Sequence, residues 1–277
     1  MDIKDNDPVS SSSSSLIHET ATIHPQAIVE PGAKISANVE VGPWSFIGSD
    51  VEIGEGTKIM SHVVLKGPSK IGKHNTIFQF SSVGEDCQDK KYAGELTHLE
   101  IGDHNTIREG CTIHRGTIQD NSITKIGNNN LFMAYVHVAH DCVIGNDCIF
   151  ANNATLAGHV HVADNAILGG GSMVHQFCKV GVHSMSAGGS IILRDVPAFV
   201  MASGQSASVH GLNTEGLKRR GFSPEQLAEL KRAYKVIYRK GLNLKDALVQ
   251  LDNDFDKSDI VSTFVDSIKN SNRGIIR

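Results

Sequence analysis

Aliphatic side chains recur at every sixth position along most of this chain. Counted in sixes from Ile17, that position holds Ile, Val or Leu as far as Val83, and the pattern resumes over residues 101–113. After a shift of one residue it runs from Ile126 to Val180, and the residue two places before each of these positions is usually small. A period of six fits neither an α-helix nor a simple amphipathic strand. It predicts a parallel β-solenoid with one short strand and one turn in each hexad.

Two interruptions of the repeat predict loops that leave the solenoid. Between Val83 and Ile101 the sixth positions fall on Asp89 and Glu95, and charged side chains inside a coil would be costly. We therefore expect residues 84–100 to form a loop extruded from a corner. The segment HRGTIQDNSITK, residues 114–125, contains the phase shift and predicts a second irregular loop. Loops on a rigid scaffold often carry function.

The extent of the repeat predicts the domain organisation. Residues 1–15 are polar and end in a run of serines, which indicates a disordered extension, with an organellar targeting remnant as the alternative. The solenoid is predicted over 16–204 and a helical domain over 205–277. In that domain Ser223 and Gln226 form a capping box, and Pro224 suits the first position of a predicted helix that Gly241 ends. Two further helices are predicted at NLKDALVQL and DIVSTFVDSIKN.

Composition narrows the class of protein. A formal net charge of −4 over 277 residues offers no broad basic surface, so we expect no nucleic-acid partner. No apolar run reaches the roughly 18 residues of a transmembrane segment, and no secretory signal is visible. Cys87 lies outside the repeat, whereas the other cysteines occupy its small inward position, which predicts buried thiols in a reducing compartment: Cys111, Cys142, Cys148 and Cys178. We expect a soluble intracellular protein, cytoplasmic in a bacterium or mitochondrial in a eukaryote.

Candidate chemistry lies in the segment VHVAHDC, residues 136–142. His140 is two residues past the inward Val138, so its side chain should point out of the core near a corner. Hexapeptide repeats of this kind resemble the parallel β-helix of the acyltransferase superfamily, in which three hexads make one coil of 18 residues. Neighbouring coils would lie about 4.8 Å apart, so this resemblance implies that Gly158 lies beside His140. An imidazole next to an uncovered glycine amide is the geometry of a general base beside an oxyanion donor. Asp141 would face away from His140 on a straight strand and can orient it only where a corner intervenes.

Two other interpretations of the histidines stay open at this point. The chain holds 14 histidines, and several share one position of the repeat, as polar surface residues at turns would: His62, His74 and His104. Alternatively, His137 and His140 could ligate zinc with a neighbouring side chain. The spacing of the histidines does not distinguish a catalytic base from a metal ligand or from a polar surface residue.

Several motifs together resemble one family. In chain order they are QDKKYAGE (88–95), TIHRGT (112–117), HVAHDC (137–142), ANNATLAGHV (151–160), VHQF (174–177) and NTEGLKRRGF (213–222). The set is similar to that of the UDP-N-acetylglucosamine acyltransferases of lipid A biosynthesis, in the hexapeptide-repeat superfamily. This resemblance runs from about residue 16 to the C-terminus. It implies a mainly β fold, a left-handed parallel β-helix with a C-terminal α-helical domain, in a homotrimer with active sites between subunits.

The resemblance also implies an activity. An (R)-3-hydroxyacyl chain would pass from acyl carrier protein to the 3-hydroxyl of UDP-N-acetylglucosamine, the first step of lipid A biosynthesis, with no metal or other cofactor. His140 would be the general base, Asp141 would orient it, and the Gly158 amide would stabilise the oxyanion. The substrate-binding residues that the resemblance implies are Gln88, Asp89, Lys91, His114, His137, His159, Gly170, His175, Gln176, Gly188, Asn213, Glu215, Arg219 and Arg220.

Three features refine this expectation. Gly188 resembles a position near the end of the acyl channel, where a glycine leaves room for a longer chain. The basic run around Arg219 suits a diphosphate or an acidic carrier protein. The pair Gln205–Ser206 stands where the family usually carries Asn–His, which changes one expected nucleotide contact. The rival classes are a hexapeptide acyltransferase with another sugar nucleotide or coenzyme A, a zinc hydratase resembling γ-class carbonic anhydrases, and a non-enzymatic scaffold.

Overall fold

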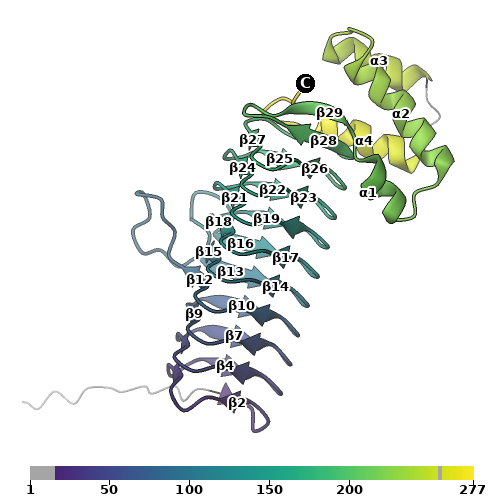
Figure 1. Cartoon of the computed structure of the whole chain (residues 1–277). Helices are drawn as coiled ribbons and strands as arrows, with labels where there is room; N and C mark the ends of the chain where they lie inside the picture. Colours follow the sequence, from purple (N-terminus) through teal and green to yellow (C-terminus); the bar gives the residue numbers. More distant parts are fainter. Residues whose placement is uncertain (1–15, 255–257) are drawn as a thin grey trace, which may run out of the picture.

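The chain winds into a long solenoid that ends in a cluster of helices (Figure 1). The computed structural model describes residues 16–254 and 258–277, so the predicted disordered extension, residues 1–15, lies outside the described residues. Each coil adds one short strand to each of three parallel sheets, here called A, B and C. This mainly β solenoid with a C-terminal helical part confirms the predicted fold class.

From β1 to β27 the strands of the three sheets follow one another in the chain order A, B, C, and the last two strands both join sheet B. Sheet A contains β1 (Leu16–Ile17), β4 (Lys34–Ile35), β7 (Val51–Ile53), β10 (Ser69–Ile71), β13 (His98–Ile101), β16 (Ile123–Ile126), β19 (Val143–Ile144), β22 (His161–Val162) and β25 (Lys179–Val180). Sheet B contains β2 (Thr22–Ile23), β5 (Glu40–Val41), β8 (Lys58–Ile59), β11 (Thr76–Ile77), β14 (Thr106–Ile107), β17 (Leu131–Phe132), β20 (Ile149–Phe150), β23 (Ile167–Leu168), β26 (Met185–Ser186), β28 (Val200–Ser203) and β29 (Ser208–Leu212). Sheet C contains β3 (Ile28–Val29), β6 (Phe46–Ile47), β9 (Val64–Leu65), β12 (Ser82–Glu85), β15 (Thr112–His114), β18 (His137–Val138), β21 (Thr155–Leu156), β24 (Met173–Val174) and β27 (Ile191–Ile192).

The hexad repeat fixes both the core and the corners. In coils without an inserted loop, paired residues of adjacent coils are 18 apart; Val138 and Leu156 are one such pair, and both are fully buried. At most corners the third residue after the inward aliphatic one has a left-handed backbone, for example His74 with φ of +53°. Asn, Asp, His and Gly tolerate that conformation better than other residues. The histidines that share this repeat position are therefore corner residues, which explains their spacing without chemistry.

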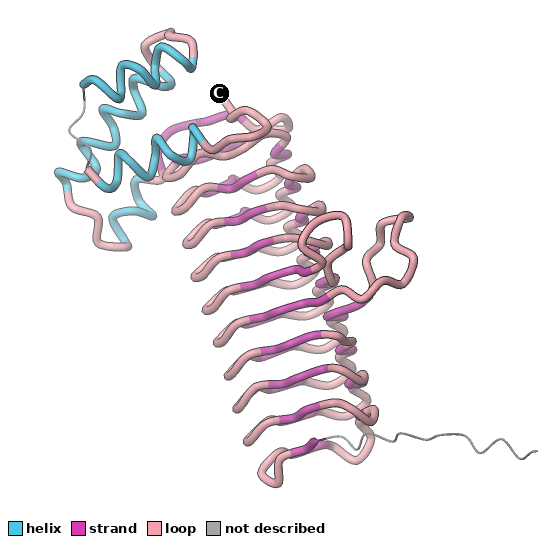
Figure 2. The backbone as a smooth tube through the Cα atoms, turned by 180° about the vertical axis from the view of Figure 1, so that it is seen from behind, coloured by secondary structure: helices cyan, strands magenta, loops and turns pink. Residues whose placement is uncertain are grey.

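The two predicted loops leave the solenoid on the same side (Figure 2). Each lies between a strand of sheet C and the next strand of sheet A, a corner that we call the C–A edge; the other corners are the A–B and B–C edges. The first loop covers residues 86–97, fewer than the predicted 84–100, because β12 and β13 lengthen to four residues each at its base. The second loop covers residues 115–122, between β15 and β16.

The helical part begins later than residue 205 and contains one helix that the sequence did not indicate. Strand β29 pairs antiparallel with β28, so strand structure continues to Leu212. The helices are α1 (Thr214–Arg219), α2 (Pro224–Tyr238), α3 (Leu244–Asp254) and α4 (Asp259–Lys269). The capping box before α2 is confirmed, with Ser223 and Gln226 bonding each other's backbone amides. In the described part of the chain no helix has the length and apolar character needed to cross a bilayer.

All five cysteines are free and buried, as the repeat predicts for those on its inward position. Burial raises the pKa of the Cys142 and Cys148 thiols to about 12, and it also raises the pKa of Cys87 in the first loop. Since the thiolate is the nucleophilic form, none of these groups is prepared for thiol chemistry.

Candidate active site

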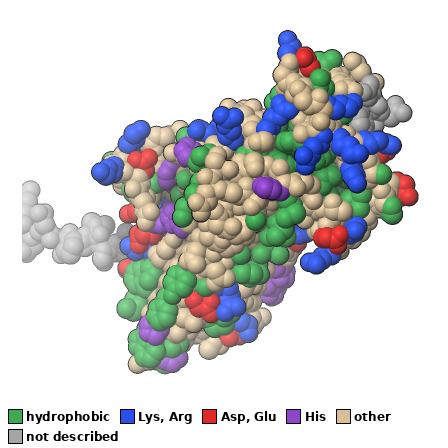
Figure 3. All heavy atoms as spheres, turned by 45° about the horizontal axis from the view of Figure 1, so that its top comes forward, with side chains coloured by type: hydrophobic (Ala, Val, Ile, Leu, Met, Phe, Trp, Pro, Cys, Tyr) green, Lys and Arg blue, Asp and Glu red, His purple; other side chains and the backbone are tan. Residues whose placement is uncertain are grey.

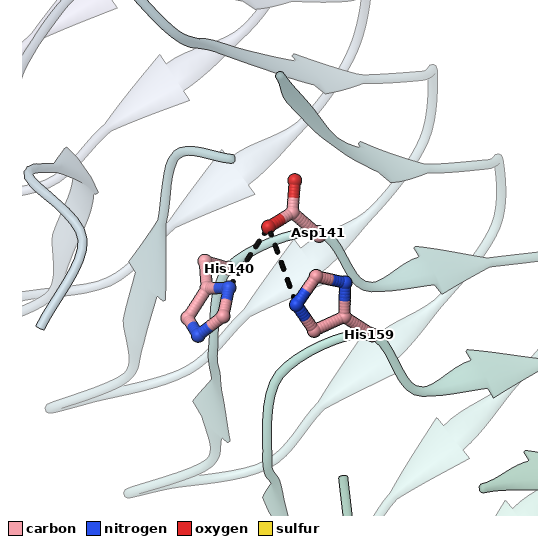
Figure 4. A group of neighbouring side chains, drawn as sticks. All are labelled: His140, Asp141 and His159. Carbon is pink, nitrogen blue, oxygen red and sulfur yellow. Dashed lines mark hydrogen bonds and ion pairs between the residues drawn. The ribbon is translucent and has the colours of Figure 1, made fainter. Parts of the chain in front are cut away.

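The candidate base and its carboxylate meet at the C–A edge between β18 and β19. Asp141 has a left-handed backbone, with φ of +58°, so the chain turns a corner between the two side chains. Asp141 Oδ2 lies 2.8 Å from His140 Nδ1 (Figure 4). The corner that this contact requires is therefore present, although the two residues are adjacent in sequence. The His140 side chain is 11% exposed and that of Asp141 only 1%.

The predicted register of His140 and Gly158 is confirmed. A Cβ atom built on Gly158 would lie 2.5 Å from His140 Cε1 and 2.6 Å from Nε2, so only glycine leaves room for the ring. The Gly158 carbonyl accepts a hydrogen bond from the Phe177 amide, whereas the Gly158 N–H donates to no other group of the described residues. This N–H can therefore serve a bound group next to His140 Nε2.

Hydrogen bonding fixes the roles of the two imidazole nitrogens. A carboxylate only accepts, so Nδ1 of His140 carries the hydrogen toward Asp141 and Nε2 of the neutral ring keeps a free lone pair. Burial disfavours the charged form of Asp141, but hydrogen bonds from His140 and Thr117 outweigh it and lower the pKa of Asp141. The carboxylate therefore stays ionised near neutral pH, as an orienting partner for a general base must.

A second histidine lies against the pair. The His159 ring stands edge-on to that of His140, with ring centroids 5.0 Å apart and an interplanar angle of 89°. His159 Nε2 is 3.8 Å from Asp141 Oδ2, and Nδ1 is 2.9 Å from Asp120 Oδ2 (Figure 4 shows the first contact). Thr117 and Asp120 belong to the second loop, and no role was predicted for either residue from the sequence. The phase shift of the repeat predicted a loop there, but it did not indicate that the loop folds back onto His140 and Asp141.

The only side chains placed to share a metal ion among the described residues differ from those that the zinc alternative named. Within the described residues, one group of His, Cys, Asp or Glu side chains is close enough to share a metal ion: His140, Asp141 and His159. His137, which the zinc alternative paired with His140, is not in that group. Hydrogen bonds from His140 and Thr117 already satisfy the Asp141 carboxylate, so the cluster is accounted for without a metal.

His137 and His114 form a second pair on the outer side of sheet C. Their ring centroids are 5.4 Å apart, and His137 Nδ1 lies 2.7 Å from the Thr112 hydroxyl. Nδ1 of His114 donates to the Asp86 carbonyl at 2.6 Å, while its Nε2 is buried and has no partner in the described part of the chain. Burial, with the nearby His114 and His140, lowers the pKa of His137 to about 4.

We expect the His137 imidazole to remain neutral well below pH 6. Because its pKa is depressed from 6.5 to about 4 in the folded chain, the unfolded chain takes up the proton first as pH falls. Folding stability should therefore decline across that interval, and His137→Gln should make the decline shallower. Nitrogen-15 NMR of the ring titrates His137 directly; an inflection near pH 6.5 would contradict the expectation. His104→Gln, at an exposed corner, is the matched control.

The first loop carries Gln88, Asp89 and Lys91 out from the C–A edge, with Gln88 and Lys91 exposed. The buried Arg115 guanidinium anchors the loop base, since it donates to the Gly84 carbonyl, to the carboxylate of Asp86 and to the Tyr92 hydroxyl. The loop tip therefore projects from a fixed base, away from the surface of its own solenoid (Figure 1).

The other expected binding residues lie at more than one edge. His175 and Gln176 sit at the C–A edge, one coil beyond Gly158. Gly170 and Gly188 lie at the B–C edge. Asn213, Glu215, Arg219 and Arg220 lie on or beside α1, which contacts the A–B edge: Asn213 donates to the His183 carbonyl at 3.0 Å, and Arg220 bonds Asn165. One chain thus gathers the candidate base, Gly158 and the imidazoles, but not the expected acyl and nucleotide residues.

A solenoid of stacked hexads that presents a histidine–carboxylate pair beside a bare glycine amide defines a hexapeptide-repeat transferase. Residues 123–158 match the family model described as "Bacterial transferase hexapeptide (six repeats)". Residues 195–276 match the model described as "Udp N-acetylglucosamine O-acyltransferase; Domain 2". The repeat and the helical part are therefore matched separately.

Comparison of the whole chain is more specific. The acyl-[acyl-carrier-protein]–UDP-N-acetylglucosamine O-acyltransferase of Thiobacillus denitrificans is 60% identical over 93% of this chain and 100% of its own length. The crystal structure of the UDP-N-acetylglucosamine O-acyltransferase of Moraxella catarrhalis superposes with a TM-score of 0.89 at 50% identity, covering 92% and 99% of the two chains. The Arabidopsis UDP-N-acetylglucosamine acyltransferase gives 0.80 at 38% identity, covering 95% and 100%. The chain belongs to the acyl-[acyl-carrier-protein]–UDP-N-acetylglucosamine O-acyltransferase family, which confirms the resemblance seen in its motifs.

Proposed function

We propose that this protein transfers an (R)-3-hydroxyacyl chain from acyl carrier protein to the 3-hydroxyl of UDP-N-acetylglucosamine, the first step of lipid A biosynthesis. The observation that carries the proposal is the hydrogen-bonded Asp141–His140 pair with Nε2 beside the Gly158 amide. The relatives' names give the donor and acceptor, and the geometry supports the chemistry.

The proposed reaction gives each of these groups a role. His140 Nε2 takes the proton of the sugar 3-hydroxyl, and the resulting alkoxide attacks the thioester carbonyl carbon. The carbonyl oxygen becomes an oxyanion that accepts a hydrogen bond from the Gly158 N–H. Collapse of this intermediate breaks the carbon–sulfur bond, and the His140 imidazolium returns its proton to the departing thiolate. Asp141 stabilises the imidazolium between these steps.

We further propose a homotrimer with one active site between each pair of subunits. The outer face of sheet C and the B–C edge expose large apolar side chains, including Ile28 (60%), Trp44 (56%) and Phe80 (67%). The outer face of sheet A instead carries ion pairs such as Lys34–Glu52. Packing the B–C edge of one copy against the C–A edge of the next would cover the apolar face. It would also bring Gly170 and Gly188 opposite a neighbour's His140.

In such a trimer the first loop would reach the adjoining site. Gln88, Asp89 and Lys91 would contact substrate there, since the loop base is anchored and its tip projects outward. Sedimentation equilibrium should give three chains per particle, and Trp44→Glu with Phe80→Glu should yield monomers without activity. An active monomer would contradict this assembly.

The carrier protein and the nucleotide would bind near the helical end. Lys and Arg side chains gather there on the face seen in Figure 3. Glu215 and Lys218 pair on α1 at 2.9 Å, and Asn213 caps the helix. The diphosphate would meet Arg219 and Arg220, because the guanidinium fork matches phosphate oxygens. An acidic carrier protein would use the surrounding positive charge.

The relatives favour one of the two compartments considered above. Those that are 57–60% identical are bacterial, whereas the Arabidopsis enzyme is 38% identical. We therefore propose the bacterial cytoplasm as the place of action.

A donor and acceptor series tests the proposed function. Purified protein is mixed with UDP-N-acetylglucosamine and 3-hydroxyacyl carrier proteins, and the acylated sugar nucleotide is followed by mass spectrometry. Coenzyme A thioesters and other N-acyl sugar nucleotides form the comparison set. Faster transfer from coenzyme A, or to another sugar nucleotide, would replace the proposal with the rival acyltransferase.

Gly188→Met should shift the donor preference toward shorter acyl chains. A Cβ on Gly188 would come no closer than 3.4 Å to its own chain, at the Gly170 carbonyl, so the larger side chain fits on the surface. It would then occupy space at the B–C edge that we assign to the end of the acyl chain. The ratio of kcat/KM for short and long donors should change by about tenfold or more. An unchanged ratio would remove Gly188 from the channel.

A further inference from the structure

The second loop returns to the candidate active site after leaving the coil. Residues 115–122 start at the end of β15 and run along the C–A edge. A Cβ on Gly116 would collide with the backbone of Ser122 and Ile123, so glycine lets the two ends of the loop pass closely. The Thr117 carbonyl accepts from the Ser122 amide at 3.1 Å and closes the turn. The position of Thr117 is thus set by backbone contacts on both sides.

Thr117 supplies three of the hydrogen-bond contacts to the Asp141 carboxylate. Its amide lies 2.9 Å from Oδ1 and 3.1 Å from Oδ2, and its hydroxyl donates to Oδ2 at 2.6 Å. The Asp141 amide donates in turn to the Thr124 hydroxyl at 2.8 Å. Thr117 and Asp141 are both buried, so water does not replace these donors. The hydroxyl and His140 Nδ1 share one oxygen, which fixes the rotation of the carboxylate.

We propose that Thr117 is a positioning residue for acyl transfer: it holds the Asp141 carboxylate at the angle at which Oδ2 meets His140 Nδ1. This inference rests on the proposed function, because it assigns a task to the partner of the proposed base. Without the hydroxyl, Oδ2 keeps only part of its donor set and the buried carboxylate turns toward its remaining partners. His140 then loses the contact that aims Nε2 at the space beside Gly158. Substrate binding should be unaffected, because Thr117 is buried and its hydroxyl is bonded to Asp141.

The test compares three substitutions at one position. In Thr117→Val the shape is kept and the hydroxyl is lost; kcat should fall by about tenfold to a hundredfold, with both KM values unchanged. Thr117→Ser keeps the hydroxyl and should restore most of kcat. Thr117→Ala also removes the hydroxyl and leaves a smaller side chain. It replaces Thr117→Val in the test if the valine variant folds poorly. Thr106→Val, on the outer face of sheet B, is the matched control.

Each outcome has one meaning. A Thr117→Val variant with the parental kcat overturns the inference, whether or not its KM is raised. A Thr117→Ser variant as slow as Thr117→Val also overturns it. Thermal unfolding of every variant separates loss of fold from loss of rate. Two controls are assayed in parallel. Absence of acyl transfer by the unsubstituted protein refutes the proposed function itself, and an active His140→Ala enzyme refutes the role of His140 as the base. An inactive His140→Ala enzyme beside a fully active Thr117→Val enzyme refutes only the role of Thr117.

Discussion

Replacing His140 with alanine should lower the rate of acyl transfer by about a hundredfold to ten-thousandfold while the solenoid stays folded. The proposed proton acceptor is lost, and the two neighbouring imidazoles are poor replacements: Nε2 of His159 lies 3.8 Å from Asp141, and burial lowers the pKa of His137 to about 4. The fold should survive because Asp141 keeps its Thr117 donors and the coil keeps its inward aliphatic residues. Single-turnover kinetics with carrier-protein donor gives the rate, and circular dichroism gives the fold.

A matched substitution separates the base from a generic histidine. His104 occupies an exposed corner and stacks on His74, with ring centroids 5.1 Å apart. His104→Ala removes the same side chain from the same solenoid and should retain the full rate. Equal losses in the two variants, or a His140→Ala enzyme with parental turnover, would contradict the role of His140 as the general base.

The repeat made much of the fold and part of the site predictable. Once the phase of the hexads is known, each residue has a place on its coil and a neighbour 18 positions away. This register correctly predicted that Gly158 lies beside His140 and that the four cysteines within the repeat are buried. The register predicts no neighbours for residues in the inserted loops. The folding back of Thr117 onto Asp141 depends on close backbone packing at Gly116, which carries no periodic signal.

Two other features of the structure were not predictable from the sequence, and both have local causes. Helix α1 has only six residues and little apolar periodicity, so no helix was predicted from its sequence. It forms because Asn213 accepts from the Gly216 amide and Leu217 packs into the core. The contact of Asp141 with His140 likewise depended on a left-handed corner at one residue, which the sequence allowed but did not require.

Gly158→Ala should lower kcat by about a hundredfold to a thousandfold, the usual cost of losing an oxyanion donor. The added methyl group would overlap the His140 ring, since its carbon would fall 2.5 Å from Cε1 and 2.6 Å from Nε2. Either the ring moves away from Asp141 or the coil shifts and takes the amide with it. Gly48→Ala, at the same edge but far along the solenoid, meets its nearest neighbour at 3.3 Å and should have little effect on rate.

Proton NMR of the His140 Nδ1–H distinguishes the two responses of Gly158→Ala. If the ring is displaced, its hydrogen bond to Asp141 breaks and the low-field resonance of that proton disappears together with activity. If the resonance persists while activity falls, the ring has kept its place and the loss belongs to the Gly158 amide. Both results agree with a base and an oxyanion donor held side by side by the 18-residue register. Parental kcat in Gly158→Ala would show that the reacting carbonyl lies elsewhere.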